Sequence, residues 1–319
     1  MAGMAVPPDR ETLRAAGTAL AADRVAAQMA DVLEKAGVSF ILLRGPSIAR
    51  HLYSSSEVRP YVDVDLLVPI HQAPVVESTL PRRGFAYRAV LGQRQVDRPH
   101  WSSTWVRASD GANIDVHWTL VGVNVSPETA WTEFVGETEP IDVCGTRLDG
   151  LSARATALVI ALHAAHHGAG ITQPIRDLDR ALAKFDLEIW SGAAQLAERL
   201  DGVDAFSAGL RLAAGGEEMA DRLSLPPVRS TEVLLRSSTA PPMALGFDWL
   251  SHTSGVRAKV ILIAGKLVPD APFMRSWTPL ARRGRVGLWV AYAWRPIWLL
   301  RHAVPGYRAW REARRKAEG

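Results

Sequence analysis

The chain has 319 residues, of which 48% are hydrophobic, so it can bury a substantial core and has room for two domains. Its single cysteine, Cys144, excludes an internal disulfide, and we expect it to be a small core residue rather than a nucleophile. The formal net charge is +4, but residues 275–319 hold eleven Arg and Lys against two Glu, so the rest of the chain is net acidic, which disfavours a nucleic-acid partner.

Changes in composition along the chain predict an α/β (α+β) core with a mixed sheet, followed by an all-helical C-terminal domain. The expected regions are a flexible N-terminal tail over 1–17, an α/β domain over 18–150, a helical domain over 151–237, and a linker with a basic, Trp-rich helical segment over 238–319. Neither a secretory leader nor a run of about 18 apolar residues is visible, so we expect a cytoplasmic protein without a spanning helix.

The first predicted helix is alanine-rich and covers 21–37, with Gly37 at its end. A short buried strand is expected over 38–43, and a helix over 48–53 follows the sequence Arg44-Gly45-Pro46-Ser47. A strand, a glycine turn and a helix N-terminus can form an anion cradle, to which Arg44 would add a fork of donors and Ser47 a hydroxyl. The alternative is a plain turn in which Gly45 serves only backbone geometry.

Two aspartates, Asp63 and Asp65, stand two positions apart in a β-branched, apolar segment over 59–68. A strand points alternate side chains to opposite faces, so these carboxylates should emerge side by side. Adjacent carboxylates repel and favour a hard divalent cation between them, Mg²⁺ above all, although an exposed edge strand is the alternative. The residues expected on the opposite, core-facing side are Val62, Val64 and Leu66.

Further along, the sequence predicts a helix over 69–84, polar strands over 85–107, a second alternating strand over 113–118 and a hairpin over 142–149. Asp115 and His117 share one face of the second alternating strand. If this strand pairs beside the Asp63 strand, three carboxylates converge, which suits a pair of Mg²⁺ ions. We expect His117 to pack beside the ligands, and Asp110 to belong to a turn.

This order of motifs resembles the polymerase-β-like nucleotidyltransferase superfamily and, more narrowly, the bacterial family of uncharacterised nucleotidyltransferases. The residues that carry the resemblance are Leu43-Arg44-Gly45, Leu52-Tyr53, Arg59-Pro60, Asp63-Val64-Asp65-Leu66-Leu67-Val68, Gly84-Phe85 and Ile114-Asp115-Val116-His117-Trp118. Three residues differ from the usual pattern: Pro46 stands where Ser or Gly is common, Arg44 where the narrower family commonly has Lys, and Asp115 where it often has Glu.

The resemblance implies a nucleotidyltransferase that moves a nucleoside monophosphate, with ATP and AMP favoured, to a hydroxyl of a small-molecule, natural-product or peptide or protein acceptor, releasing pyrophosphate. It implies that two Mg²⁺ ions, or Mn²⁺ in their place, are held by Asp63, Asp65 and Asp115, with Asp115 as a ligand or as the base for the incoming hydroxyl. The residues implied at the nucleotide phosphates are Arg44, Gly45, Ser47 and Arg59.

The second half is expected to begin with a helix over 155–168 that carries His163 and His167 four residues apart. A metal pair is geometrically possible there, but packing or contact with the acceptor is favoured because no acid of the His-Glu-x-x-His kind lies between them. The resemblance indicates that Asp177 faces the cleft.

The basic segment over 275–319 also holds five tryptophans, Trp277, Trp289, Trp294, Trp298 and Trp310. Such a pattern suits peripheral contact with a membrane surface, while packing on the helical domain with arginines in solvent is the favoured alternative. Three other functions stay open: a catalytically degenerate nucleotide-binding or regulatory protein, a membrane-associated scaffold, and a hydrolase with the same metal site.

Overall fold

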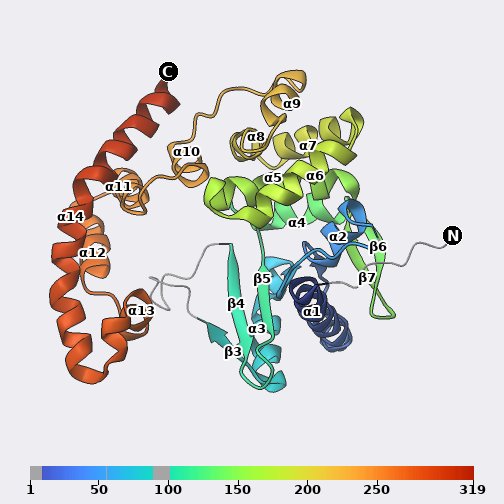
Figure 1. Ribbon diagram of the computed structural model, residues 1–319, viewed down its shortest axis with the longest axis horizontal. Coiled ribbons are helices and arrows are strands. Elements are labelled where there is room, and N and C mark those ends of the chain that lie inside the picture. The colour runs from blue at the N-terminus through green and yellow to red at the C-terminus, as the bar shows by residue number, and fades with distance from the viewer. Residues whose placement is uncertain (1–8, 55, 89–100) are drawn as a thin grey trace. The chain divides into compact units, whose positions relative to one another are not determined.

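The computed structural model describes residues 9–54, 56–88 and 101–319, and it consists of a mixed sheet with helices before and between its strands, followed by a helical region (Figure 1). The sheet has seven strands in the order β3-β4-β5-β2-β1-β7-β6. Every described element after β7 is helical, so the predicted fold class is confirmed. The strands are β1 (Ile41–Leu42), β2 (Asp63–Leu67), β3 (Phe85–Arg88), β4 (Ser102–Arg107), β5 (Asn113–His117), β6 (Thr138–Val143) and β7 (Thr146–Leu151).

The α-helices of the described residues are α1 (Arg10–Lys35), α2 (Pro46–Leu52), α3 (Ala73–Thr79), α4 (Pro127–Val135), α5 (Ala153–His167), α6 (Thr172–Lys184), α7 (Leu187–Arg199), α8 (Val203–Leu210), α9 (Gly216–Arg222), α10 (Thr231–Ser237), α11 (Met243–His252), α12 (Val256–Leu267), α13 (Ala271–Trp277) and α14 (Gly284–Glu318). Short 3-10 turns are η1 (Ile70–Gln72), η2 (Leu80–Arg83), η3 (Gly168–Gly170) and η4 (Pro279–Arg282). None of these helices is both long and apolar enough to cross a membrane.

Two compact units divide the described residues. The first comprises those of 1–88, 101–160 and 177–202, and therefore contains the whole sheet with α1 to α4, α7 and parts of α5 and α6. The second comprises 161–176 and 203–319, which is helical throughout. Each unit has its own apolar clusters.

Helix α1 begins at Arg10, earlier than predicted, so residues 10–17 of the expected tail are helical. The missed signal is Asp9, whose carboxylate caps the helix by accepting the Thr12 N–H at 2.7 Å. Gly37 ends the helix as predicted, with a left-handed φ of 70°. The buried side of α1 packs in one cluster with the apolar face of β2 and β5, and this cluster includes Val25, Met29, Leu33, Val64, Leu66, Ile114 and Val116.

The centre of the sheet alternates as the sequence predicts. In β2, Val64 and Leu66 are buried toward α1, and in β5 Ile114 and Val116 are buried on the same side. The acidic side chains therefore emerge on the opposite face. Val62 was predicted to share the core but is 64% exposed, because it precedes the first paired residue of β2.

Two other local predictions change. The helix predicted over 69–84 is broken into η1, α3 and η2, since Pro74 and Pro81 cannot donate the backbone hydrogen bonds that a continuous helix needs. Cys144 is exposed rather than buried, because it lies with Gly145 in the tight turn between β6 and β7, both at positive φ. Of the strands predicted over 85–107, β3 and β4 are present, and residues 89–100 lie outside the described part of the chain.

In the second unit, α14 is a single helix of 35 residues with Pro296 and Pro305 inside it. One apolar cluster joins it to α10 and α11, where the Trp310 Nε1–H donates to Asp248 at 3.2 Å. Another joins it to α13 and η4, where the buried Arg295 lies over the rings of Phe273 and Trp277. Of the linker predicted over 238–246, residues 243–246 belong to α11.

We predict that Gly150→Ala lowers the free energy of unfolding by about 1–3 kcal/mol, measured by urea denaturation. A Cβ at this position in β7 would lie 2.7 Å from Ser47 Oγ and 2.9 Å from Ile141 Cδ1, so buried neighbours must move. Gly136→Ala is the matched control, because its Cβ would meet only ordinary contact at 3.5 Å. Equal stability of the two variants would contradict the tight packing described for β7.

Candidate active site

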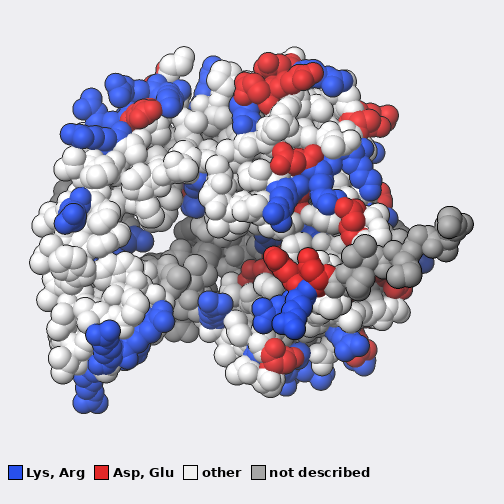
Figure 2. Space-filling model, viewed as in Figure 1, with Lys and Arg blue, Asp and Glu red and all other residues white. Residues whose placement is uncertain are grey.

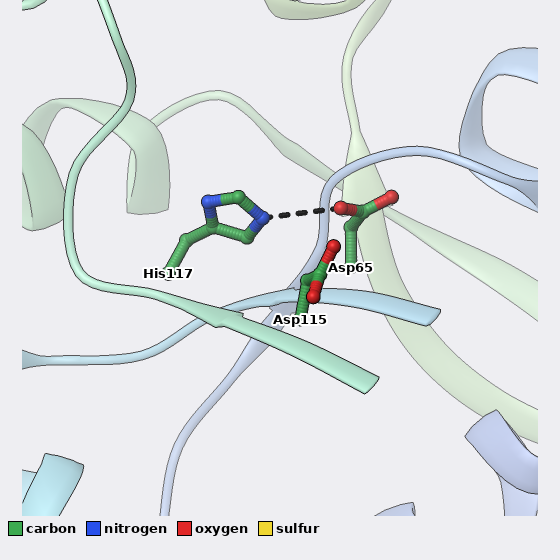
Figure 3. A group of neighbouring side chains, drawn as sticks. All are labelled: Asp65, Asp115 and His117. Atoms are coloured by element: carbon green, nitrogen blue, oxygen red, sulfur yellow. Dashed lines mark hydrogen bonds and ion pairs between the residues drawn. The ribbon is translucent and has the colours of Figure 1, made fainter. Parts of the chain in front are cut away.

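The acidic residues are brought together by the parallel pairing of β2 with β5. The register places Asp65 opposite Asp115, and Leu67 opposite His117. The sequence predicted that Asp115 would join Asp63 and Asp65 if their two strands paired. The two strands do pair, and Asp115 lies beside Asp65 (Figure 3).

Asp65, Asp115 and His117 form the closest group, with one ligand-capable atom of each lying within 4.8 Å of the others. His117 Nε2 lies 3.1 Å from Asp65 Oδ1, the contact drawn in Figure 3. As an N–H donor to that oxygen, His117 would fix the orientation of the carboxylate, because carboxylates that bind a metal are themselves held by hydrogen bonds. The group combines two hard oxygen donors with one positioning side chain.

The group fits a divalent cation. Oδ1 of Asp115 is buried and has no hydrogen-bond partner among the residues that the structure describes. A buried carboxylate oxygen without a partner is costly, and a bound cation would remove that cost. Carboxylate oxygens suit Mg²⁺ and Mn²⁺ better than imidazole does, so Asp65 and Asp115 are the natural ligands of the group.

Asp63 lies two residues before Asp65 on the same face of β2, outside the closest group. Burial, reinforced by the neighbouring Asp65 carboxylate, raises the pKa of Asp63 to about 6. A carboxylate with a raised pKa is poised to gain charge when a cation approaches. Asp63 therefore stands where it could complete the ligand set.

Arg44 supplies the positive charge of the site. Its guanidinium donates to Asp65 Oδ1 and lies 3.4 Å from His117 Nε2. Burial would raise the pKa of Asp65, but the charge of Arg44, with the hydrogen bond from His117, holds it well below the usual range. Arg44 thus neutralises the most buried acid of the group, whereas the sequence predicted Arg44 at the nucleotide phosphates.

The Gly45 turn differs from the expected cradle. Gly45 has a φ of 62°, and a Cβ there would lie 3.3 Å from the Tyr61 ring, so glycine is required. The following Pro46 has no N–H, and the Ser47 N–H donates to the Arg44 carbonyl at 3.2 Å. Few backbone donors are left for an anion at this turn.

Ser47 has a structural role in place of the predicted phosphate contact. Its side chain is fully buried, and its Oγ accepts the Leu151 N–H at 2.8 Å. This bond ties α2 to the end of β7. It lies beside Gly150, where a Cβ would come within 2.7 Å of Ser47 Oγ. The Ser47 hydroxyl is therefore engaged by the backbone of β7.

Arg59 and Asp177, predicted at the phosphates and at the cleft, instead bind each other. Arg59 donates to both Asp177 oxygens, with Nη2 to Oδ2 at 2.7 Å, and both side chains are buried. The Tyr53 hydroxyl adds a third donor to Asp177 at 2.8 Å. Sequence reasoning missed this pair because its members are 118 positions apart and nothing local links them.

His163 and His167 lie on α5 in the second unit, with ring centroids 4.6 Å apart in an edge-on contact, and His166 lies 4.7 Å from the His167 ring. Within the described ranges, no group of three metal-capable side chains other than Asp65, Asp115 and His117 was found. The edge-on ring contacts agree with the packing interpretation of the two histidines.

Comparison with known proteins adds a family. The model of a family described as "Uncharacterised nucleotidyltransferase" matches residues 8–215. No curated protein matches the sequence.

Solved structures show only a loose likeness. A lincomycin-bound lincosamide antibiotic adenylyltransferase, LnuA, aligns with 14% identity over 50% of this chain and 94% of its own, at a TM-score of 0.34. The antibiotic-resistance factor ANT(2'')-Ia aligns with 14% identity over 59% of this chain and 95% of its own, at a TM-score of 0.38. An antigenic nucleotidyltransferase-like protein from Paracoccidioides brasiliensis aligns with 13% identity over 65% of this chain and 96% of its own, at a TM-score of 0.35.

We predict that Arg59→Met and Asp177→Leu each lower the free energy of unfolding by about 3–5 kcal/mol, because each leaves a buried charge without its partner. The double variant should lose much less than the sum of the two, as a urea-denaturation double-mutant cycle would show. Lys35→Met, which breaks the exposed pair with Asp31, is the control and should cost at most about 1 kcal/mol. An Arg59→Met protein of unchanged stability would contradict the structural role.

We also predict that, in the presence of a chelator, Asp63→Asn is more stable than the wild type at pH 7.5, by about 1–2 kcal/mol. The folded-state pKa of about 6 lies above the ordinary 3.8, so the stability contributed by protonated Asp63 is full below pH 3.8 and is lost as the pH rises through 6. The two proteins should therefore converge near pH 4 in urea titrations.

Asp110→Asn is the control for that titration, since Asp110 pairs with Arg107 and its pKa is lowered by that hydrogen bond. It should gain no stability at pH 7.5. A difference between Asp63→Asn and the wild type that is the same at both pH values would overturn the assignment to Asp63.

Proposed function

The chain belongs to the uncharacterised nucleotidyltransferase family and is a nucleotidyltransferase, and we propose that it transfers a nucleoside monophosphate, AMP favoured, from a nucleoside triphosphate to an acceptor hydroxyl with release of pyrophosphate. The observation that carries the proposal is the opposed pair Asp65 and Asp115 on parallel strands, with an orphaned buried oxygen on Asp115. Two such carboxylates on a rigid sheet match the needs of phosphoryl chemistry, which depends on positioning and charge neutralisation.

Asp65 and Asp115, with Asp63 beside them, are the residues that would hold Mg²⁺, or Mn²⁺ in its place, and two ions are proposed. Bound there, the metal would polarise the α-phosphate and neutralise charge on the triphosphate. His117 would keep Asp65 oriented through its contact at 3.1 Å.

In the proposed transfer, the acceptor oxygen forms a bond to the α-phosphorus while the bond from that phosphorus to the oxygen bridging to the β-phosphate breaks. The electron pair leaves with pyrophosphate. The hydroxyl proton passes to a carboxylate, for which Asp115 is the candidate if it serves as the base and not as a metal ligand, since its Oδ1 has no hydrogen-bond partner among the described residues.

Arg44 is proposed to change partners during this cycle. Asp65 needs a positive charge in its buried position, and Arg44 supplies it when no cation is there. Once a metal takes over that charge, the guanidinium is available to pair with phosphate oxygens, which match its fork of donors. This exchange would reconcile the contact seen here with the phosphate role expected from the sequence.

The acceptor is proposed to be a small-molecule or peptide hydroxyl rather than a nucleic acid. Residues 1–274, which contain the whole sheet, are net acidic, and an acidic surface repels a polyanion. Cytoplasmic residence remains an expectation.

A degenerate nucleotide-binding protein is the second candidate, and the Arg44–Asp65 ion pair favours it, since that pair already neutralises the most buried acid of the group. Such a protein would bind nucleotide without needing a metal. A hydrolase with the same site would differ from a transferase by releasing pyrophosphate from the triphosphate when no acceptor is present.

We predict a Mg²⁺-dependent rise in thermal stability with one of the nucleoside triphosphates, and its loss in Asp65→Ala/Asp115→Ala. A ligand at about a hundred times its dissociation constant stabilises the folded state by about 2.7 kcal/mol, which a melting curve resolves easily. Asp110→Ala is the matched control, because it removes an acid from the turn before β5 without touching the group, and it should keep the shift.

A shift that is the same with and without Mg²⁺ would favour the degenerate protein. The absence of any rise in melting temperature with all of the triphosphates would contradict the proposed transfer. Where a shift is seen, pyrophosphate release with and without candidate acceptors separates transferase from hydrolase.

A further inference from the structure

The outward face of α14 is apolar, which is unusual for a surface helix. Helical spacing places its exposed apolar residues on a single stripe along the helix. Trp289 and Leu300 on this stripe are both 74% exposed. We define the α14 stripe as Val286, Trp289, Val290, Trp294, Ile297, Leu300 and Val304.

The opposite face of the same helix is the packed one. Its buried residues, Gly287, Ala291, Arg295, Gly306 and Ala313, lie about half a turn away from the α14 stripe at 100° per residue. They contact the rest of the second unit through the two apolar clusters and through Met243, which lies 2.6 Å from the position of a Cβ on Gly306. The packing predicted from the sequence is thus present, but it leaves tryptophans and aliphatic residues, and not only arginines, in solvent.

Helix α12 extends the exposed apolar surface of the second unit. None of its described residues is buried, and Val256, Val260 and Ile263 follow one another at helical spacing with 80%, 57% and 45% of their surface exposed. The visible surface over α12 to α14 is largely uncharged, with Lys and Arg gathered mainly toward its two ends (Figure 2).

Basic residues continue the α14 stripe toward the C-terminus. Arg308, Arg311 and Arg315 occupy the same helical face as the stripe and line a hollow of about 640 Å³. Phe247 and Tyr307 supply aromatic walls, and Glu312 is an acid in the lining, so the hollow joins three arginines and one glutamate to apolar surface. Such a combination suits a group with a phosphate attached to a hydrocarbon body.

We propose that the second unit docks on an anionic lipid bilayer, with α14 lying in the plane of the interface. The α14 stripe would enter the boundary between headgroups and acyl chains, where tryptophan rings are favoured. Arg308, Arg311 and Arg315 would meet lipid phosphates, and the excess of eleven basic over two acidic residues in 275–319 would attract the surface.

Charge favours this occupant over a second copy of the chain. Two copies joined through their α14 stripes would bring two strongly basic segments together, which costs electrostatic free energy. An anionic bilayer instead complements the arginines and the apolar stripe in one contact. The proposal is independent of the proposed transfer reaction, because none of the residues that it uses belongs to the acidic group.

The test is flotation of the full chain with vesicles of phosphatidylcholine alone or with phosphatidylglycerol, in the absence of nucleotide. We expect several-fold more binding to the anionic vesicles, weakened by high salt. Trp289→Glu/Leu300→Glu should reduce binding by about tenfold or more, since it replaces two apolar groups on the stripe with charges. Leu13→Glu/Leu20→Glu on α1, at positions that are also exposed, is the control and should bind as the wild type does.

A second readout places the contact. In a Cys144→Ser background, an environment-sensitive dye on Ile297→Cys should brighten on anionic vesicles, because position 297 lies in the middle of the α14 stripe. Circular dichroism checks that all variants fold. Binding that is unchanged in Trp289→Glu/Leu300→Glu, a dye that does not respond, or a dimer that the double variant dissolves without any vesicle binding would each overturn the proposal.

Discussion

Asp65 is an almost fully buried carboxylate, and the surrounding structure is arranged around the need to place a positive charge beside it. The Leu43 N–H donates to the Asp65 carbonyl, which fixes the end of β1 against β2 and brings the next residue, Arg44, to the carboxylate. The parallel pairing of β5 adds His117 from the other side. The strand arrangement that brings Arg44 and His117 to the Asp65 carboxylate therefore also brings together the carboxylate oxygens that a metal would bind.

The local parts of this site were predictable from sequence, because they depend on side-chain alternation. Asp63 with Asp65, and Asp115 with His117, share faces as a period of two requires. The partners that come from distant segments were not predictable: Ser47 bonds to Leu151, Arg59 to Asp177, and neither link leaves a local pattern. Sequence reasoning therefore predicted which acids share a face, but it did not predict the internal hydrogen bonds of Ser47, Arg59 and Asp177.

The second unit shows a different limit of sequence reasoning. The basic and tryptophan-rich composition of 275–319 was evident, but a tally of residues does not tell which side of a helix is packed. Small residues decide this: Gly287, Ala291 and Gly306 allow close approach on one face, so the bulky side chains are left on the other. A helix whose small residues face inward and whose large apolar residues face outward is inverted relative to an ordinary surface helix.

The position of β1 has a consequence for how the chain folds. This strand is two residues long and lies between β2 and β7, so its second neighbour is made about a hundred residues after it. Until residue 151 has left the ribosome, β1 has one open edge, because β7, its neighbour on that side, is not yet complete. A nascent chain that stalls before β7 therefore exposes strand edges that can pair with other chains, and this gives chaperones a defined interval in which to act.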